Sequence, residues 1–215
     1  MRSEHMVTTV DTVILANGDF PTAGLPLQLL RDAPHIVACD GAAIPLLRGG
    51  GVPEGWGDSD NLTIIGDGDS IADEYRHRLI QVDEQDDNDL TKATRYCMAQ
   101  GWHRIAYVGC TGRREDHTMG NIALLMRYHQ EFHLDVLMAT DHGWFVPATG
   151  PQTFSSQKGQ QVSIFNFSCT QLQSTGLKWQ AYPYRQLWQG TLNEALGSEF
   201  TIEADGNYLI YRTYR

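Results

Sequence analysis

The feature that most constrains the fold is an alternation, over the first two-thirds of the chain, between short apolar runs and segments with helical periodicity. The runs are rich in β-branched residues and are apolar along nearly their whole length. Such runs are typical of parallel strands that helices cover on both faces. We therefore predict strands within 7–16, 35–40, 62–67, 79–82, 104–109 and 134–139, and helices within 24–32, 42–48, 72–78, 89–100 and 118–130.

The pattern changes after about residue 140, where the helical periodicity ends. Short alternating segments follow at 161–168, 200–205 and 208–214, and the residues between them are rich in Gly, Ser, Asn and Pro. This pattern predicts antiparallel strands of a sandwich or barrel, with a turn at 149–152. The expected fold class is α/β, with an N-terminal parallel-sheet domain over 1–142 and a C-terminal antiparallel β-sandwich over 143–215.

Composition narrows the class of protein. The 215 residues are 41% hydrophobic and 20% charged, which is ordinary for a globular protein. No apolar stretch approaches the ~18 residues of a transmembrane helix, and the N-terminus lacks the apolar core of a signal peptide. The four cysteines show no CxxC spacing, which disfavours a zinc site and a disulfide framework. We expect a cytoplasmic protein without a membrane partner.

The net charge of the chain limits the kinds of ligand that it can bind. The formal net charge is −10, and this disfavours nucleic acid as a ligand. A phosphorylated small molecule remains compatible where a metal ion or local arginines offset the repulsion. Several acidic residues stand beside glycines, and others form the run at 83–89. These acidic positions are the candidates for function.

Polar segments, most of them containing glycine, recur where the predicted strands end. In a parallel sheet, ligands bind outside the carboxyl ends of the strands, so we expect these segments to meet at one edge. Glycine lets the backbone approach a ligand closely, and carboxylates suit Mg²⁺, which combines a few of them with substrate phosphates. The segments are 16–19, 40–42, 66–70, 86–92 and 109–117.

Asp67 and Asp69 stand two residues apart after an apolar strand. In an extended chain both side chains lie on one face, which is suitable geometry for one metal ion. Taken alone, the pair is more simply interpreted as solvated turn residues, with an Asx cap for a helix from Ile71. The other acidic turns shift the interpretation to a metal site.

Asp89 is predicted to begin a helix that Asn88 caps, and Lys92 lies on the same face as Asp89. A phosphate contact by Lys92 and a plain surface ion pair are both compatible with this spacing. The segment from Thr111 to His117 contains glycine and two arginines and precedes a helix, so it suits phosphate binding, although a solvated loop is the simpler alternative. His117 could be a metal ligand, a base or a helix cap.

Motifs typical of other nucleotide-binding proteins and of serine hydrolases are absent from the sequence. The chain has no GxxxxGK[ST] phosphate loop and no GxGxxG after its first strand. It also has no GxSxG nucleophile elbow, so a serine hydrolase of that type is excluded.

Taken in order, the motifs resemble the thiamine pyrophosphokinase family. The match runs from Asn17 to about Leu125, and the segments 176–179 (GLKW) and 190–194 (GTLNE) extend it into the C-terminal part. Any one motif is weak, whereas several in the right order are specific. The matching segments of the N-terminal part are ANG at 16–18, DGA at 40–42, GDGDS at 66–70, NDLTKA at 88–93, TGRREDH at 111–117 and GN at 120–121.

The resemblance implies transfer of the diphosphoryl group of ATP to the thiamine hydroxyl, giving thiamine diphosphate and AMP. It also implies a homodimer whose active sites lie between the α/β domain of one chain and the sandwich of the other. Mg²⁺ would be held against the ATP phosphates by Asp67, Asp69 and Asp89. The implied catalytic residues are these three together with Lys92, Arg114 and Asp116.

The resemblance also assigns the substrate contacts. Trp179, supplied by the partner chain, would stack on the cationic thiazolium ring of thiamine, and Asn193 and Glu194 would complete that site. The proton acceptor could be Asp69 or Asp116. The implied ATP-binding residues are Asn17, Asp40, Gly41, Thr111, Gly112, Arg113, His117 and Asn121.

Three positions depart from the family pattern. Arg113 stands where glycine is usual, Leu192 replaces a serine, and Gly68 stands where a bulkier residue is common. None of these changes removes a charged motif position.

Two alternatives remain open: a diphosphokinase for another hydroxymethyl heterocycle such as a pterin, and a non-catalytic module that binds thiamine or a nucleotide.

Overall fold

The structure is a computed structural model that describes residues 9–22, 24–49, 61–82, 84 and 86–214. It divides into two compact units, which are described separately. The α/β unit holds Val10–Ile122 and Met138–Asp141, and the β unit holds Ala123–Leu137 and the chain from His142 onward. Two residues of the acidic run at 83–89, Asp83 and Gln85, lie outside the described residues, as does the start of the strand predicted at 7–16.

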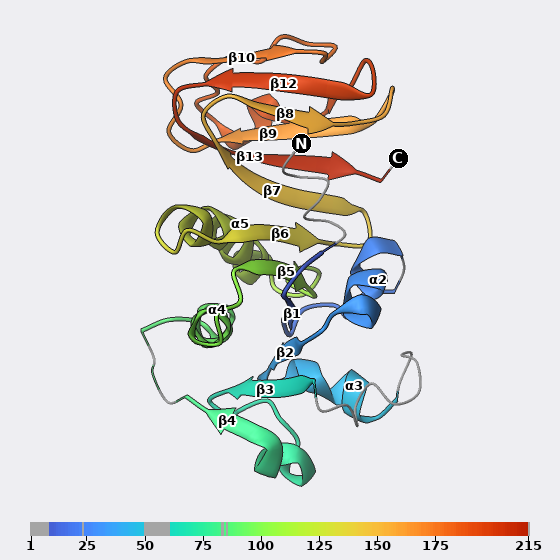
Figure 1. The fold of residues 1–215 in the computed structure, drawn as a ribbon, viewed down its shortest axis with the longest axis vertical. Helices are drawn as coiled ribbons and strands as arrows, with labels where there is room; N and C mark the ends of the chain where they lie inside the picture. Colours follow the sequence, from blue (N-terminus) through green and yellow to red (C-terminus); the bar gives the residue numbers. More distant parts are fainter. Residues whose placement is uncertain (1–8, 23, 50–60, 83, 85, 215) are drawn as a thin grey trace. The chain divides into compact units, whose positions relative to one another are not determined.

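A parallel sheet forms the centre of the α/β unit (Figure 1). Its strands lie in the order β5-β1-β2-β3-β4, and every pairing is parallel. β1 and β2 are buried at every position, as continuous apolar runs require. The predicted parallel α/β domain is thereby confirmed. The strands are β1 (Thr12–Leu15), β2 (Ile36–Cys39), β3 (Leu62–Gly66), β4 (Leu79–Gln81) and β5 (Arg104–Val108).

The helices lie where the sequence predicts them, but not all of them are α-helices. The segment predicted at 72–78 is the 3₁₀ helix η2 (Asp73–Arg78), because none of its residues is buried to support an α-helix. The longest helix begins three residues before the predicted 118. Among the described residues, no helix is both long and apolar enough to cross a membrane. The other elements are α2 (Gly24–Asp32), η1 (Asp40–Ala43), α3 (Ile44–Leu47), α4 (Asp89–Ala99) and α5 (Glu115–Gln130).

The β unit consists of two antiparallel sheets around an apolar core. One sheet has the order β11-β9-β13-β7 and the other β10-β12-β8. The core includes Phe154, Ile164, Phe200 and Tyr208, all fully buried. This arrangement confirms the predicted C-terminal antiparallel strands. Besides β6 (Asp135–Ala139), the strands are β7 (Gly143–Thr149), β8 (Gln152–Ser155), β9 (Gln161–Asn166), β10 (Leu172–Thr175), β11 (Asn193–Glu194), β12 (Glu199–Ala204) and β13 (Asn207–Thr213), with the 3₁₀ helix η3 (Leu187–Gly190).

Four strands of the β unit, β7, β8, β10 and β11, lie outside the segments that the sequence pattern predicts. β7 is buried at five of its seven positions, so it reads as a continuous run and not as an alternating strand. β10 has the sequence LQST, which is too short and polar to be recognised by itself. The turn predicted at 149–152 is confirmed, because β7 ends at Thr149 and β8 starts at Gln152.

Candidate functional site

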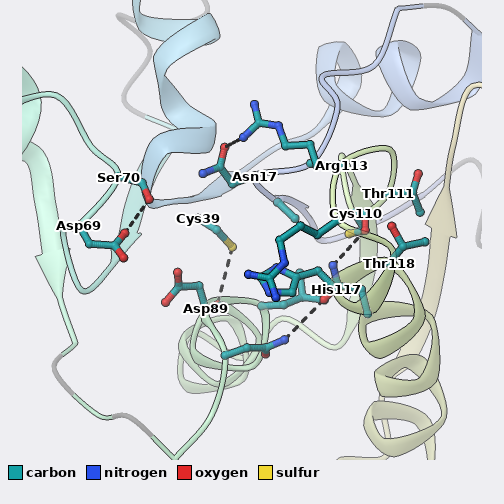
Figure 2. A pocket seen from close by; sticks show the side chains of 16 residues that line it. Asn17, Cys39, Asp69, Ser70, Asp89, Cys110, Thr111, Arg113, His117 and Thr118 are labelled. Carbon is teal, nitrogen blue, oxygen red and sulfur yellow. Dashed lines mark hydrogen bonds between the residues drawn. The ribbon is translucent and has the colours of Figure 1, made fainter.

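The polar segments of the α/β unit meet around a cavity of about 380 Å³ (Figure 2). The cavity lies where β1, β2, β3 and β5 end, as the topology of a parallel sheet predicts. Its lining combines apolar and polar side chains and carries both acidic and basic groups. The predicted site residues that line it are Asn17, Asp69, Asp89, Thr111, Arg113, Arg114, His117 and Asn121.

Three carboxylates form a cluster beside this cavity. Asp40, Asp67 and Asp69 each place one oxygen within 4.8 Å of the others. Asp40 is buried, and its Oδ2 accepts a hydrogen bond from the backbone N–H of Ser70 at 3.0 Å. Its Oδ1 is also buried but has no hydrogen-bond partner among the described residues. Burying a carboxylate oxygen without a hydrogen-bond donor costs free energy. A cation bound by the cluster would offset that cost.

The close approach of the cluster depends on Gly66, the last residue of β3. A Cβ atom at position 66 would lie 2.8 Å from the Cβ of Asp40, a distance that real side chains do not tolerate. Asp40 itself adopts φ 43°, in the left-handed region that disfavours a side chain. The backbone is therefore held in an unfavourable conformation at the point where the acidic side chains converge.

The pKa values of Asp40 and Asp69 are shifted in opposite directions. Burial raises the pKa of Asp40, and the neighbouring carboxylate of Asp69 raises it further. The pKa of Asp69 is lowered, chiefly because the hydroxyl of Ser70 donates to its Oδ1 at 2.6 Å. Carboxylate oxygens are ligands that Mg²⁺ and Ca²⁺ take in proteins. The donor set therefore fits a hard divalent cation.

Asp89 is not a member of the cluster, although it was predicted as a metal ligand. It lines the cavity and lies 3.3 Å from the Nζ of Lys92, whose side chain is buried. After the Ser70 hydroxyl, the charge of Lys92 also contributes to the lowered pKa of Asp69. Lys92 therefore forms the ion pair with Asp89 that the spacing predicts, but its buried side chain shows that the pair is not a fully solvated one.

The arginines of the loop after β5 have different partners. Arg113 donates from Nη1 to the side-chain oxygen of Asn17 at 3.0 Å, across the mouth of the cavity (Figure 2). Arg114 makes a bidentate pair with Asp116, with distances of 3.1 Å and 2.6 Å. Both members of that pair are exposed. The arginines are thus close to the cavity and accessible to an anionic ligand.

His117 and Asn121 follow in α5. The backbone N–H of His117 donates to Asp116 Oδ1 at 2.9 Å, while its side chain lines the cavity. Asn121 donates from Nδ2 to the carbonyl of Cys110 at 2.9 Å, which ties the helix to the loop. Among the described residues, the one group of three or more metal-ligating side chains is the Asp40 cluster, and it does not include His117.

Two further predicted residues lie around the cavity without lining it. Gly41 lines a neighbouring cavity, and Gly112 adopts φ 97°, where the space of a Cβ is taken by the carboxylate of Asp19. Ser70 was noted only as part of a motif, yet its N–H and hydroxyl hold two of the three clustered carboxylates. Its position directly after Asp69 was the signal available in the sequence.

The β unit brings its own predicted residues together. Trp179 is 54% exposed, and its backbone N–H and carbonyl pair with the side-chain amide of Asn193 at 3.1 Å and 2.8 Å. Lys178 lies 4.8 Å from the Trp179 ring and 3.2 Å from Glu194. The amide of the buried Asn193 is thus used to fix the backbone of Trp179. The ring of Trp179 is about half exposed and has the Lys178 ammonium over it.

Two family models match this chain. One, described as thiamin pyrophosphokinase, catalytic domain, matches residues 27–138. The other, described as thiamin pyrophosphokinase, substrate-binding domain, matches residues 143–211. The first alone spans more than half of the chain. No curated protein matches this chain.

Solved structures share the fold. The thiamine pyrophosphokinase of Bacillus subtilis is 22% identical, with a TM-score of 0.72, and the match covers 94% of this chain and 98% of that one. The thiamin pyrophosphokinase of Candida albicans is 18% identical, with a TM-score of 0.78, covering 97% and 90%. The yeast protein is 13% identical, with a TM-score of 0.79, covering 98% and 89%.

Proposed function

The chain belongs to the thiamin pyrophosphokinase family, and on that basis we propose that it transfers the diphosphoryl group of ATP to the hydroxyl of thiamine. The products are thiamine diphosphate and AMP. The observation that carries this proposal is the convergence of Asp40, Asp67 and Asp69 beside a cavity lined by arginines. Carboxylates that hold a cation and arginines that face an anion are the two parts that phosphoryl transfer requires.

Mg²⁺ is the cofactor we propose for the acidic cluster. Asp67 and Asp69 would hold it, and Asp40 Oδ1, buried without a donor, supports the same cation. When bound, the ion neutralises charge on the phosphates and makes the β-phosphorus more electrophilic. Asp89 was predicted as a third ligand and stays a prediction, since it lies outside the cluster but lines the cavity.

The protein's own residues position the donor. Lys92, buried below the acidic edge, offsets the negative charge that three carboxylates and a polyphosphate bring together. Arg113 and Arg114 are exposed at the cavity and offer guanidinium groups for bidentate phosphate contacts. Asp116, by pairing with Arg114 before substrate binds, fixes the direction of that guanidinium.

The attacking group is the thiamine hydroxyl, and AMP leaves as the bond to the β-phosphorus breaks. Asp69 and Asp116 were the two candidates for accepting the hydroxyl proton. The Ser70 hydroxyl lowers the pKa of Asp69, and Arg114 lowers that of Asp116, so both are weak bases. A loose phosphoryl-transfer transition state needs little general-base assistance, so we propose that both carboxylates act by positioning and that the hydroxyl proton passes to solvent.

For the acceptor, we propose that Trp179 stacks on the thiazolium ring. An exposed indole face attracts a cation, an interaction of roughly 1–2 kcal/mol when water is excluded. The described β unit exposes further large apolar side chains, which suits a surface covered in a homodimer. They are Tyr182, Leu187, Trp188, Leu192 and Leu196.

The experiment that tests the function is mass spectrometry of the products formed from Mg-ATP and thiamine. Thiamine diphosphate with an equal amount of AMP is the expected result. Thiamine monophosphate with ADP would show that the γ-phosphoryl group is transferred and would overturn the proposed reaction.

The same assay separates the two alternatives. Product from a hydroxymethylpterin, and none from thiamine, would identify another acceptor. Binding of ATP and thiamine without AMP release would identify a binding module. The clustered carboxylates disfavour a binding module, because binding a polyphosphate alone does not call for three acidic groups beside it.

A further inference from the structure

The side chains of Lys178, Trp179 and Glu194 meet in the β unit. The Nζ of Lys178 lies 4.8 Å from the centre of the Trp179 ring, within the ~6 Å over which a cation and an aromatic face attract each other. The same Nζ donates a hydrogen bond to Glu194 Oε2 at 3.2 Å. The ammonium therefore lies between an aromatic face and a carboxylate, which are also the two groups that attract an organic cation from solution.

The ring and the carboxylate of this arrangement are attached to backbone that is held in place. The N–H of Lys178 donates to the carbonyl of Glu194 at 2.9 Å. The side-chain amide of the buried Asn193 accepts from the N–H of Trp179 and donates to its carbonyl. The part that is free to move is the lysine side chain, because its charge is carried on a flexible four-carbon stem.

The contacts that hold the ammonium are weak enough to be exchanged. The side chains of Lys178 and Glu194 are 47% and 37% exposed, and partly solvated ion pairs contribute little to stability. An ammonium is strongly hydrated, so it returns to water readily. A thiazolium ring is a flat, delocalised cation that stacks on an indole over a larger area. It is therefore able to take the place of the ammonium on the Trp179 ring.

The charge of the ligand decides how strongly Lys178 opposes it. A cationic ring draws on both the indole and the carboxylate, and the ammonium beside them repels it. A neutral ring draws on the indole alone, and Lys178 keeps Glu194 as its partner while that ring binds. Lys178 therefore weakens the binding of cationic ligands and leaves neutral ones nearly unaffected.

We propose that Lys178 is an internal competitor for the acceptor. Its ammonium fills the cation site formed by Trp179 and Glu194 in the free protein and is displaced when the cationic ring of thiamine binds. This inference rests on the proposed function, because it takes thiamine to be the acceptor. The product keeps the same ring, so the return of Lys178 to the site also favours release of the product.

The test is calorimetric binding of two probes to the intact chain: thiamine, and an analogue whose thiazolium is replaced by a neutral aromatic ring of the same shape. Lys178→Met and Lys178→Gln are each expected to bind thiamine at least about threefold more tightly than the wild type. Their affinity for the neutral analogue should change by less than about twofold.

Two matched variants control for charge. Lys158→Met removes the same charge from an exposed position of the same unit, and it should leave both affinities unchanged. Lys178→Arg keeps a cation at the site, so it should gain no affinity for thiamine.

Unchanged or weaker thiamine binding in both neutral variants of Lys178 would overturn the proposal. So would an equal gain for the neutral analogue, which would indicate steric relief, or an equal gain in Lys158→Met, which would indicate an effect of overall charge. Mass spectrometry of products separates this inference from the reaction. Tighter thiamine binding without thiamine diphosphate formation supports the competitor and rejects the reaction, whereas product formation with unchanged affinity rejects only the competitor.

Discussion

At the scale of single residues, Asp40 combines features that folding alone does not favour. It is buried, it adopts a positive φ, and one of its carboxylate oxygens has no hydrogen-bond partner among the described residues. Each feature costs free energy, and such costs are concentrated at functional sites. The residue is best explained by a ligand that completes its environment.

Replacement of the clustered acids is expected to stop turnover without unfolding the protein. Asp67→Asn and Asp69→Asn remove charge that the cation needs, while the side-chain volume is kept, so we expect a loss of about 10²-fold or more in kcat. Asp73→Asn is the matched control, since Asp73 is an exposed acid of η2 outside the cavity. Near-normal kcat in both cluster variants would reject the metal assignment.

Gly66→Ala should damage the same cluster through sterics. The new methyl group would lie 2.8 Å from the Cβ of Asp40 and push the two strand ends apart. We expect a loss of about 1–3 kcal/mol in the free energy of unfolding, together with weaker Mg²⁺ binding. Urea unfolding and metal titration measure the two effects, and Gly197→Ala, where the added atom meets open space outside the helices, is the control.

At the scale of elements, α4 depends on its first residues. Asn88 caps it by accepting from the backbone N–H of Thr91 at 3.0 Å, and Leu90, Ala93 and Cys97 bury one face. The cap places Asp89 at the cavity and Lys92 beneath it. Formation of the helix and geometry of the site are therefore set by the same residue.

Asn88→Ala should destabilise the protein by about 1 kcal/mol, the usual cost of losing such a cap. Asn88→Ser retains an oxygen that accepts the same bond, so it should recover most of the loss. Urea unfolding of the three proteins checks this. Equal stability of the alanine and serine variants would show that the cap contributes nothing.

In the β unit, the loop between β12 and β13 is fixed by one carboxylate. Asp205 accepts hydrogen bonds from the hydroxyl and N–H of Thr170 and from the N–H of Gln171. The Thr170 hydroxyl and these amides lower the pKa of Asp205 below its ordinary value of 3.8. The carboxylate therefore stabilises the folded state at pH values above about 4.

The pH dependence of stability follows from the lowered pKa of Asp205. A lowered folded-state pKa means that the stabilisation is complete above the unfolded pKa and is lost as the pH falls through the folded one. The stability difference between wild type and Asp205→Asn should be constant from about pH 7 to about pH 5 and shrink below about pH 4. Urea midpoints across this range measure it, and a difference that stays constant to low pH would contradict the assignment.

At the scale of the whole molecule, the proposed dimer makes a test by complementation possible. If Asp69 and Trp179 of one active site come from different chains, mixed dimers of Asp69→Asn and Trp179→Ala contain one intact site. Random exchange of subunits should then restore about one quarter of wild-type activity from two inactive proteins. Mixtures that stay inactive although exchange is demonstrated would show that the two residues do not meet across an interface.

The periodicity of the sequence was sufficient for the fold class, because alternating apolar runs and helical segments have few compact solutions. It was insufficient for β7, β8, β10 and β11, whose place in the sheets comes from pairing with distant strands. The domain boundary at residue 142 stays a prediction. The order of the motifs was sufficient for the family, and the roles of individual site residues remain predictions.

That polar, glycine-containing segments follow the strands and that acidic residues gather there could be predicted from the order of residues, since both are local properties of the chain. Which acids converge depends on the folded structure. It grouped Asp40 with Asp67 and Asp69 and left Asp89 with Lys92, because contact at a strand end depends on register and on the close approach that Gly66 permits.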